Sequence, residues 1–291
     1  MTYLYYPGCS LEGSAREYDI STRSALKALD VTLMDIPDWT CCGASAAASV
    51  STLLSLVLPA RNLALAEAIP GADDILAPCS ACYLNLKKAE VQARDESERS
   101  RLNAVLEVEN LRISGRMRVR HLLDVLSRDI GADRIREKVT APLSGKRIAP
   151  YYGCQCLRPY RVFDDPERPV SMNALIEATG AQVFSWNMGA VCCGASNMST
   201  HAAVGTSLTT AILKAAKGAD AIVTVCPMCQ MNLEAYQDGI SQSCQDNLRI
   251  PVMYLPQLLG LAFGLPRADI RLDLNLSEAG AFAAGPAQAE R

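Results

Sequence analysis

The chain of 291 residues is poor in histidine and carries no excess of positive charge. It contains only 2 His, and its 28 Lys and Arg are outnumbered by 31 Asp and Glu, which gives a formal net charge of −3. Nucleic acids and anionic lipids are held mainly by a positive electrostatic field, which this composition does not supply. We therefore expect no nucleic-acid partner.

The sequence also lacks a long hydrophobic run. Its longest apolar stretch, Leu53 to Leu65, is interrupted by Pro59 and Arg61, and falls short of the ~20 residues that cross a bilayer. The N-terminus, MTYLYYPGCS, has no basic region and no room for the apolar core of a signal peptide. We therefore predict a cytoplasmic protein without a membrane span. Because cytoplasmic thiols stay reduced, its 12 cysteines indicate metal ligands rather than disulfides.

What the sequence does have is an internal repeat. YYPGC at residues 5–9 returns as YYGC at 151–154, and CCGAS at 41–45 returns unchanged at 192–196. The CxxC motif that begins at Cys79 returns at Cys226. The three offsets of 145, 151 and 147 residues are nearly equal, which indicates a duplication. A weaker fourth match relates residues 119–126 to residues 252–259.

The repeat predicts the domain organisation. We expect a first domain over residues 1–143 and a second over 144–266, joined by a segment that contains Pro142 and Gly145, as a linker should. Residues 267–291 are rich in Ala and Gly and show no periodicity, so we expect a loosely ordered C-terminal tail. A final docking helix is the alternative for this segment.

Short strands alternate with helices in each half. The expected strands cover residues 2–6, 31–36, 74–77, 147–151, 182–185 and 221–225. The expected helices of the first half cover residues 14–30, 44–68 with a break near Pro59, 80–90 and 97–110. This alternation predicts an α/β fold of two Rossmann-like halves related by a pseudo-twofold axis, each a small, mainly parallel sheet flanked by helices. The cysteines then fall at the C-terminal ends of strands, where α/β folds place ligands.

Ten of the twelve cysteines form two sets of five. The sets are Cys9, Cys41, Cys42, Cys79 and Cys82, and Cys154, Cys192, Cys193, Cys226 and Cys229. A CxxC pair lets two thiolates reach one metal centre, and an adjacent pair can do so if the following glycine bends the loop. Zinc and a cubane cluster each take four ligands, so five thiolates fit a more open iron–sulfur cluster better. Structural zinc in one or both halves stays the alternative.

Six further residues carry weaker expectations. Cys156 and Cys244 have no partner in the repeat, so we expect ordinary thiols, with a role for Cys156 beside Cys154 left open. His121 aligns with Tyr254 and is expected to pack or cap. His201 follows the second CCG and is a candidate proton donor, although an ordinary surface role is favoured. Asn85 and Asn232, each three residues after a CxxC, are expected to brace that loop.

This layout resembles a known family. A Cys, a CCG and a CxxC, present twice over residues 1 to about 266, resemble the cysteine-rich CCG domain and the architecture of the B subunit of heterodisulfide reductase. The resemblance implies one non-cubane [4Fe–4S] cluster in each half, with the first set of five cysteines as ligands of cluster 1 and the second set as ligands of cluster 2. It also implies two partners, a ferredoxin-like iron–sulfur subunit (C-subunit type) and a flavoprotein (A-subunit type).

The resemblance further implies an activity. We expect an oxidoreductase subunit that cleaves or forms a disulfide or persulfide bond within a larger electron-transfer complex, with sulfur metabolism as one setting. The substrate would be a disulfide, a thiol or a protein-bound dithiol, held between two halves that face each other. The chain has no flavin or nicotinamide fingerprint, so other subunits must carry the electrons to it or from it. The alternatives are an electron-relay subunit that meets no substrate, and a zinc-stabilised interaction module.

Overall fold

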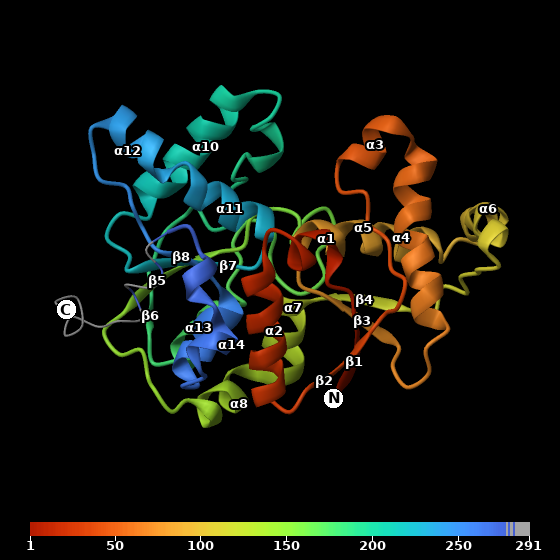
Figure 1. The fold of residues 1–291 in the computed structure, drawn as a ribbon, viewed down its shortest axis with the longest axis horizontal. Helices are drawn as coiled ribbons and strands as arrows, with labels where there is room; N and C mark the ends of the chain where they lie inside the picture. The colour runs from red at the N-terminus through yellow and green to blue at the C-terminus, as the bar shows by residue number, and fades with distance from the viewer. Residues whose placement is uncertain (278, 280–281, 283–291) are drawn as a thin grey trace.

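The computed structural model describes residues 1–277, 279 and 282, and it contains two parallel sheets (Figure 1). The first sheet has the order β2-β1-β3-β4 and the second the order β6-β5-β7-β8. The strands are β1 (Thr2–Tyr5), β2 (Thr32–Asp35), β3 (Asp74–Ala77), β4 (Arg118–His121), β5 (Arg147–Tyr151), β6 (Gln182–Val183), β7 (Ala221–Thr224) and β8 (Val252–Tyr254). The two identical orders confirm the predicted α/β fold of two similar halves.

Helices connect the strands in both halves. Those of the first half are α1 (Gly8–Glu12), α2 (Arg16–Ala28), α3 (Ala46–Val50), α4 (Thr52–Glu67), α5 (Ser80–Gln92), α6 (Glu96–Leu106), η1 (Glu107–Glu109), α7 (Leu122–Asp124), η2 (Val125–Ile130) and α8 (Gly131–Lys138). Those that follow are α9 (Asn173–Ala178), η3 (Ala195–Asn197), α10 (Ala202–Ala215), α11 (Pro227–Ala235), α12 (Gln237–Cys244), α13 (Leu255–Ala262), α14 (Arg267–Ile270) and η4 (Leu272–Leu274).

The fourth sequence match marks the fourth strand of each sheet. β4 pairs with β3, and β8 pairs with β7, each in parallel. A helix follows each of them at once, α7 after β4 and α13 after β8. The two segments are recognisably related in sequence, but neither was predicted to be a strand.

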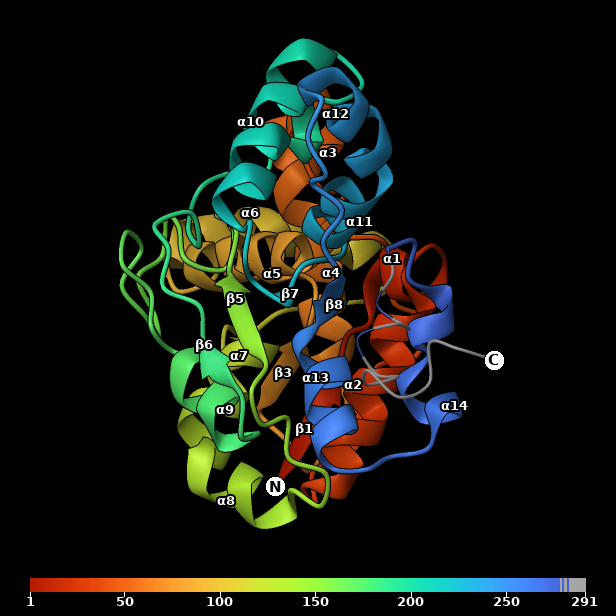
Figure 2. The same ribbon diagram turned by 90° about the vertical axis from the view of Figure 1, so that its left-hand side faces the viewer.

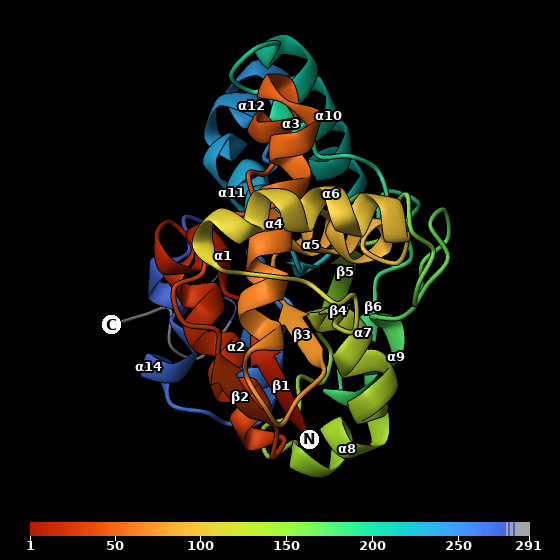
Figure 3. The ribbon, with the colours of Figure 1, turned by 90° about the vertical axis from the view of Figure 1, so that its right-hand side faces the viewer.

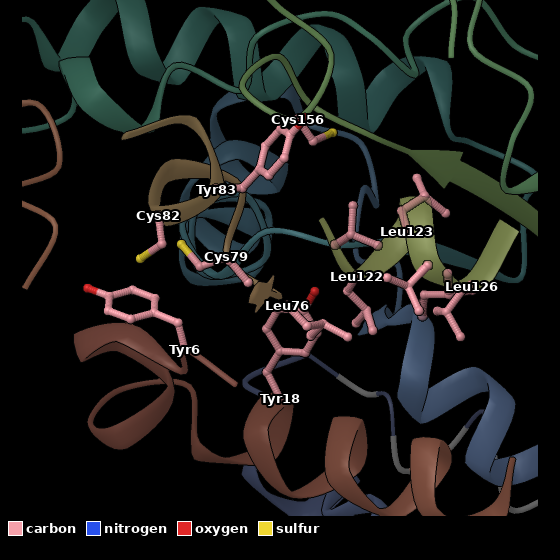
Figure 4. Close-up of a cluster of buried hydrophobic side chains, with 14 of the residues drawn as sticks. Tyr6, Tyr18, Leu76, Cys79, Cys82, Tyr83, Leu122, Leu123, Leu126 and Cys156 are labelled. Atoms are coloured by element: carbon pink, nitrogen blue, oxygen red, sulfur yellow. The ribbon is translucent and has the colours of Figure 1, made fainter. Parts of the chain in front are cut away.

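The two halves pack into one body. α2 packs against α13, and α8 packs against α9. These contacts are equivalent under the duplication, because α2 and α9 each connect the first two strands of a half, whereas α8 and α13 lie beyond the fourth strand. One buried apolar cluster accordingly takes residues from both halves, among them Leu4, Leu122, Tyr254 and Leu258 (Figure 4 shows part of it).

The helix that we expected over residues 44–68 is interrupted at Ser51 and not near Pro59. Ser51 adopts an extended conformation (φ −160°, ψ 133°), and its hydroxyl accepts a hydrogen bond from the Leu54 N–H at 3.3 Å, which caps α4. α4 then continues through Pro59, because packing of its buried face against α5 compensates for the hydrogen bond that proline cannot donate. α3 and the start of α4 stand away from the sheets, as does α10 (Figures 2 and 3).

The start of the segment that we expected to be loosely ordered packs on both halves, with α14 against α2 and α13. Residues 267–274 form α14 and η4, Ile270 is buried, and the Ser277 hydroxyl donates to the Glu234 carboxylate at 2.6 Å. Of residues 278–291 of the expected tail, all except 279 and 282 lie outside the described residues. Within the part of the chain that the structure describes, no helix has both the length and the apolar character needed to cross a bilayer.

Candidate metal centres

All ten predicted ligand cysteines follow strand ends on the same side of their sheets. In the first half, Cys9 follows β1, the Cys41–Cys42 pair follows β2, and Cys79 ends the loop between β3 and α5. The order β2-β1-β3 reverses direction between β1 and β3, and parallel sheets bind ligands at the carboxyl ends of strands beside such a reversal. The second half places its five cysteines in the same way around β5, β6 and β7.

The structure brings the cysteines of each set together. The Sγ atoms of Cys41 and Cys9 are 3.7 Å apart, those of Cys42 and Cys82 are 3.6 Å apart, and Cys79 lies beside Cys82. In the second set, the Cys193 and Cys229 sulfurs are 3.5 Å apart. Cys154 lies beside Cys192 and Cys226 beside Cys229. We call these sets the first and second cysteine groups. Figure 4 shows Cys79 and Cys82 beside Tyr6.

Glycines let the backbone approach the sulfurs closely. Gly8 has φ +73°, and a Cβ atom at this position would lie 2.6 Å from the Cys82 Sγ. Gly153 has φ +69°, and its Cβ would lie 3.0 Å from the Cys229 Sγ. Gly43 and Gly194, with φ +83° and +81°, provide the bend that each adjacent cysteine pair was predicted to need. The role of Gly8 and Gly153 was not predicted, although both repeats carry glycine directly before the first cysteine.

A tyrosine ties two cysteine loops together in each half. The Tyr6 hydroxyl donates to the Thr40 carbonyl at 2.7 Å, and the Tyr151 hydroxyl donates to the Val191 carbonyl at 2.6 Å. Both carbonyls immediately precede an adjacent cysteine pair. Burial, reinforced by the nearby thiols, raises the pKa of both tyrosines far above the ordinary value, so both hydroxyls remain donors. The sequence repeat showed these tyrosines but not what they bind.

An asparagine that follows each CxxC motif braces the CCG loop, and not the CxxC loop that we expected it to brace. The Asn85 amide donates to the Ala44 carbonyl at 2.9 Å and lies 3.6 Å from the Cys42 Sγ. The Asn232 amide donates to the Cys193 carbonyl at 2.8 Å, which the buried Thr209 hydroxyl also reaches at 3.1 Å. In each half, a buried asparagine side chain therefore holds the backbone of the CCG loop in place. Thr209 was not foreseen, because it lies far from any cysteine in the sequence.

One thiol of the first group and two of the second have a pKa near neutral pH. A hydrogen bond from Cys82 lowers the pKa of Cys42 to about 6, and one from Cys154 lowers that of Cys192 to about 6. A hydrogen bond from Cys229 lowers the pKa of Cys226 to about 7. The pKa of each donor thiol is raised, first because its S–H takes part in the hydrogen bond, and then by burial and by repulsion between neighbouring thiolates. A thiolate is the form that binds metal, so the groups are electrostatically suited to that task.

The donor set fits an iron–sulfur cluster better than a single ion. The contacts within each group are all between thiols, which are the ligands that iron–sulfur clusters use. Cys82 lies beside both Cys42 and Cys79, and Cys229 lies beside both Cys193 and Cys226. Five thiols in each group exceed the four ligands that a single zinc ion takes.

The remaining predicted residues lie outside the two groups. The buried Cys156 thiol donates to the Tyr152 carbonyl at 3.3 Å, and Cys244 ends α12. His121 caps α7, its Nδ1 accepting the Leu123 N–H at 3.2 Å, which confirms the predicted capping role. His201 is exposed before α10 and contacts the neighbouring Thr200 hydroxyl at 3.2 Å.

Comparison with known proteins decides the family. The model of the cysteine-rich domain named CCG matches residues 3–87 and 148–234, one copy in each half. The chain belongs to the CCG cysteine-rich family. Each matched segment ends shortly after a CxxC motif, so both copies span a complete cysteine group.

Relatives within the CCG family include components of two kinds of complex. The chain is 35% identical to the 8-methylmenaquinol:fumarate reductase membrane anchor subunit of Wolinella succinogenes, over 95% of this chain and 97% of that one. It is 30% identical to the B subunit of the ferredoxin/F(420)H(2)-dependent CoB-CoM heterodisulfide reductase of Methanosarcina acetivorans, over 93% and 92%. The predicted resemblance to the B subunit of heterodisulfide reductase is thereby confirmed.

A solved structure shares the CCG fold. The crystal structure of a hypothetical protein from Helicobacter pylori superposes with a TM-score of 0.73 at 17% identity and covers 94% of this chain. The chain spans about half of that protein, 51% of its length. This likeness concerns the fold alone.

Proposed function

We propose that this protein is a catalytic subunit similar to the B subunit of heterodisulfide reductase. It would cleave or form a disulfide or persulfide bond at two non-cubane [4Fe–4S] clusters. The observation that carries the proposal is the pair of complete five-cysteine groups at equivalent strand ends of one packed body. A four-ligand centre would leave one clustered thiol idle in each half. Family membership supports the same conclusion.

Each cysteine group has an open and a closed side. Cys9 and Cys41 are exposed and Cys154 and Cys192 half-buried, whereas the other six members are buried. The first group of cysteines would hold one cluster and the second group the other. When bound, such clusters supply electrons one at a time. The chain's own residues would fix the buried side and leave the side of Cys9 and Cys41 for a sulfur substrate to approach.

The reaction needs partners. Reduction of a disulfide breaks one S–S bond and takes up two electrons and two protons to give two thiols. We propose a flavoprotein and a ferredoxin-like iron–sulfur protein as the electron carriers, and a cytoplasmic location in which the cysteines stay reduced. The reverse reaction would release the same electrons to these partners.

Metal analysis tests the proposal. Iron, acid-labile sulfide and zinc are measured in anaerobically purified protein, and the EPR spectrum is recorded after oxidation with a candidate thiol present. Two clusters of four irons correspond to about eight iron and eight sulfide per chain. A thiol-dependent signal would support substrate contact. Zinc without iron would reject the redox function in favour of an interaction module, and four iron with one zinc would restrict it to one half.

A second candidate is an electron-relay component of a quinol-linked complex. The relative from Wolinella succinogenes, which is named as a membrane anchor, supports this candidate. A feature of the chain supports it as well: residues 44–60 and 194–213, which follow the two cysteine pairs, carry no Lys, Arg, Asp or Glu. They expose Val50, Leu53 and Val204 on the projecting helices. Flotation with lipid vesicles, lost on Val50→Asp plus Leu53→Asp, would favour this candidate, and no flotation of the parent would disfavour it.

A further inference from the structure

A buried side chain joins the two CxxC motifs. Ser80 directly follows Cys79, and its hydroxyl donates to the carbonyl of Val225 at 3.1 Å. Val225 directly precedes Cys226 of the other half. Ser80 is 1% exposed and Val225 is fully buried. One hydrogen bond therefore links the backbone of the first cysteine group to the backbone of the second.

His121 sets the direction of this hydrogen bond. Its Nδ1 accepts the Leu123 N–H, so the neutral ring carries its proton on Nε2, which lies 3.2 Å from the Ser80 Oγ. Burial lowers the pKa of His121 to about 3, so the ring is neutral at physiological pH. Because Nε2–H donates to Ser80, the hydroxyl proton of Ser80 is available for Val225. The imidazole also faces the carbonyls of Pro78 and Val225, which precede Cys79 and Cys226.

A second contact reinforces the same junction. The Tyr18 hydroxyl donates to the Pro78 carbonyl at 3.0 Å, and Figure 4 shows it directed toward the loop that carries Cys79. The Tyr18 ring stacks on Tyr254 of the other half, with centroids 4.0 Å apart and planes at 1°. The Tyr254 hydroxyl in turn donates to Gln230, the neighbour of Cys229. Tyr254 and His121 occupy equivalent positions at the ends of β8 and β4.

We propose that Ser80 and His121 are positioning residues that couple the two cysteine groups, so that metal loading of one group stabilises the other. The inference rests on the proposed function, in which both groups bind metal. Metal binding restricts the motion of Cys79 and of the adjacent Ser80. Through the buried hydrogen bond, the motion of Val225 and Cys226 is restricted as well. The residue equivalent to Ser80 in the second half is Pro227, which has no side-chain donor, so substitution of Ser80 alone removes this type of hydrogen bond from the junction.

Metal retention in a double-mutant cycle tests the coupling. Cys41→Ser plus Cys42→Ser disables the first group, and iron loss from the second group is then timed against a chelator, by EPR and by iron content. With Ser80 present, we expect disabling the first group to speed this loss several-fold. With Ser80→Ala, we expect the loss to depend clearly less on the first group. Equal rates with Ser80 present, or undiminished coupling in Ser80→Ala, would overturn the inference.

A matched variant controls for the loss of a buried hydroxyl. Ser21 is 2% exposed, and its hydroxyl donates to the Glu17 carbonyl within α2, away from both CxxC motifs. Ser21→Ala removes the same chemical group and should leave the coupling at the parent value. A reduced coupling in Ser21→Ala would mean that general loosening, and not the link, explains the Ser80 result, and would also overturn the inference.

A metal-free measurement separates this inference from the proposed function. His121→Asn keeps a good cap for α7 but is too short to reach Ser80, so it also serves if Ser80→Ala fails to fold. In metal-free protein, we expect faster amide hydrogen exchange over residues 225–229 in His121→Asn and in folded Ser80→Ala. Unchanged exchange in the folded variants would reject the positioning role. A parent that binds no iron but shows this change would reject the proposed function and leave the link standing.

Discussion

At the scale of single residues, the candidate sites depend on glycines at positive φ that lie against the cysteine sulfurs. In Gly8→Ala, the new Cβ would lie 2.6 Å from the Cys82 Sγ, at φ +73°, where an L-residue costs about 1–2 kcal/mol. We expect a folded variant whose iron content falls to about half or below, because the first group is disturbed directly and the second loses the support proposed above. Gly71→Ala is the control, since Gly71 has φ +98° and no atom within 4 Å of the added Cβ. Full iron content in Gly8→Ala would contradict the requirement for glycine beside the Cys82 sulfur.

A buried carboxylate makes stability depend on pH. Burial, and then the nearby Glu234, raise the pKa of Glu17 from 4.5 to about 7; Arg271 and Asp273 also face it. The folded state binds this proton more tightly, so its contribution to stability is present below pH 4.5 and lost as the pH rises through 7. Glu17→Gln should therefore be more stable than the parent at pH 8, by at most about 3 kcal/mol, and should lose that advantage near pH 4. Urea unfolding at both pH values measures this difference, and lower stability of the variant at pH 8 would contradict it.

At the scale of elements, the repeat predicted where the cysteine groups lie in the fold, because its motifs recur in the same order and at nearly the same spacing in both halves. Three matching motifs located both cysteine groups at strand ends, and six of the eight strands followed from apolar runs. β4 and β8 were missed, because β4 carries Arg118 and Arg120 and β8 has three residues. The break at Ser51 was missed because proline is the stronger indicator of a helix break in the sequence. Packing against α5 keeps α4 helical through Pro59. The contact of Ser80 with Val225 joins residues 145 apart, and no local pattern encodes it.

The cap of α4 gives a prediction at this scale. Ser51→Ala removes the hydroxyl that accepts the Leu54 N–H, which costs about 1 kcal/mol in typical helices. Because the start of α4 projects from the body, we expect this loss to appear as faster hydrogen exchange over residues 44–57 with little change in the unfolding midpoint. Ser49→Ala, which alters an exposed hydroxyl of α3, should leave exchange near the parent rate. Unchanged exchange in Ser51→Ala would show that the cap does not hold the projecting segment.

At the scale of the whole molecule, the two halves of the duplication share one large apolar cluster. α13 of the second half covers α2 of the first, and strands β7 and β8 of the second sheet are buried throughout. Ile148 and Val223 point into the apolar cluster that both halves share, whereas Ala149 and Ile222 point into a smaller cluster of the second half alone. The second sheet therefore belongs to both clusters, which links the stability of the projecting α10 and α12 region to that of the first half.

This shared core predicts that the two halves unfold together. The chain has 2 Trp, one in each half, so Trp186→Phe leaves Trp39 as a probe of the first half and Trp39→Phe leaves Trp186 as a probe of the second. In metal-free protein, both probes should give the same denaturant midpoint. Leu258→Ala in α13, at a fully buried position, should lower both midpoints together, because such truncations cost about 2–5 kcal/mol. If only the Trp186 transition moved, the halves would be independent domains, and a coupling between the two cysteine groups through the interface would lose its structural basis.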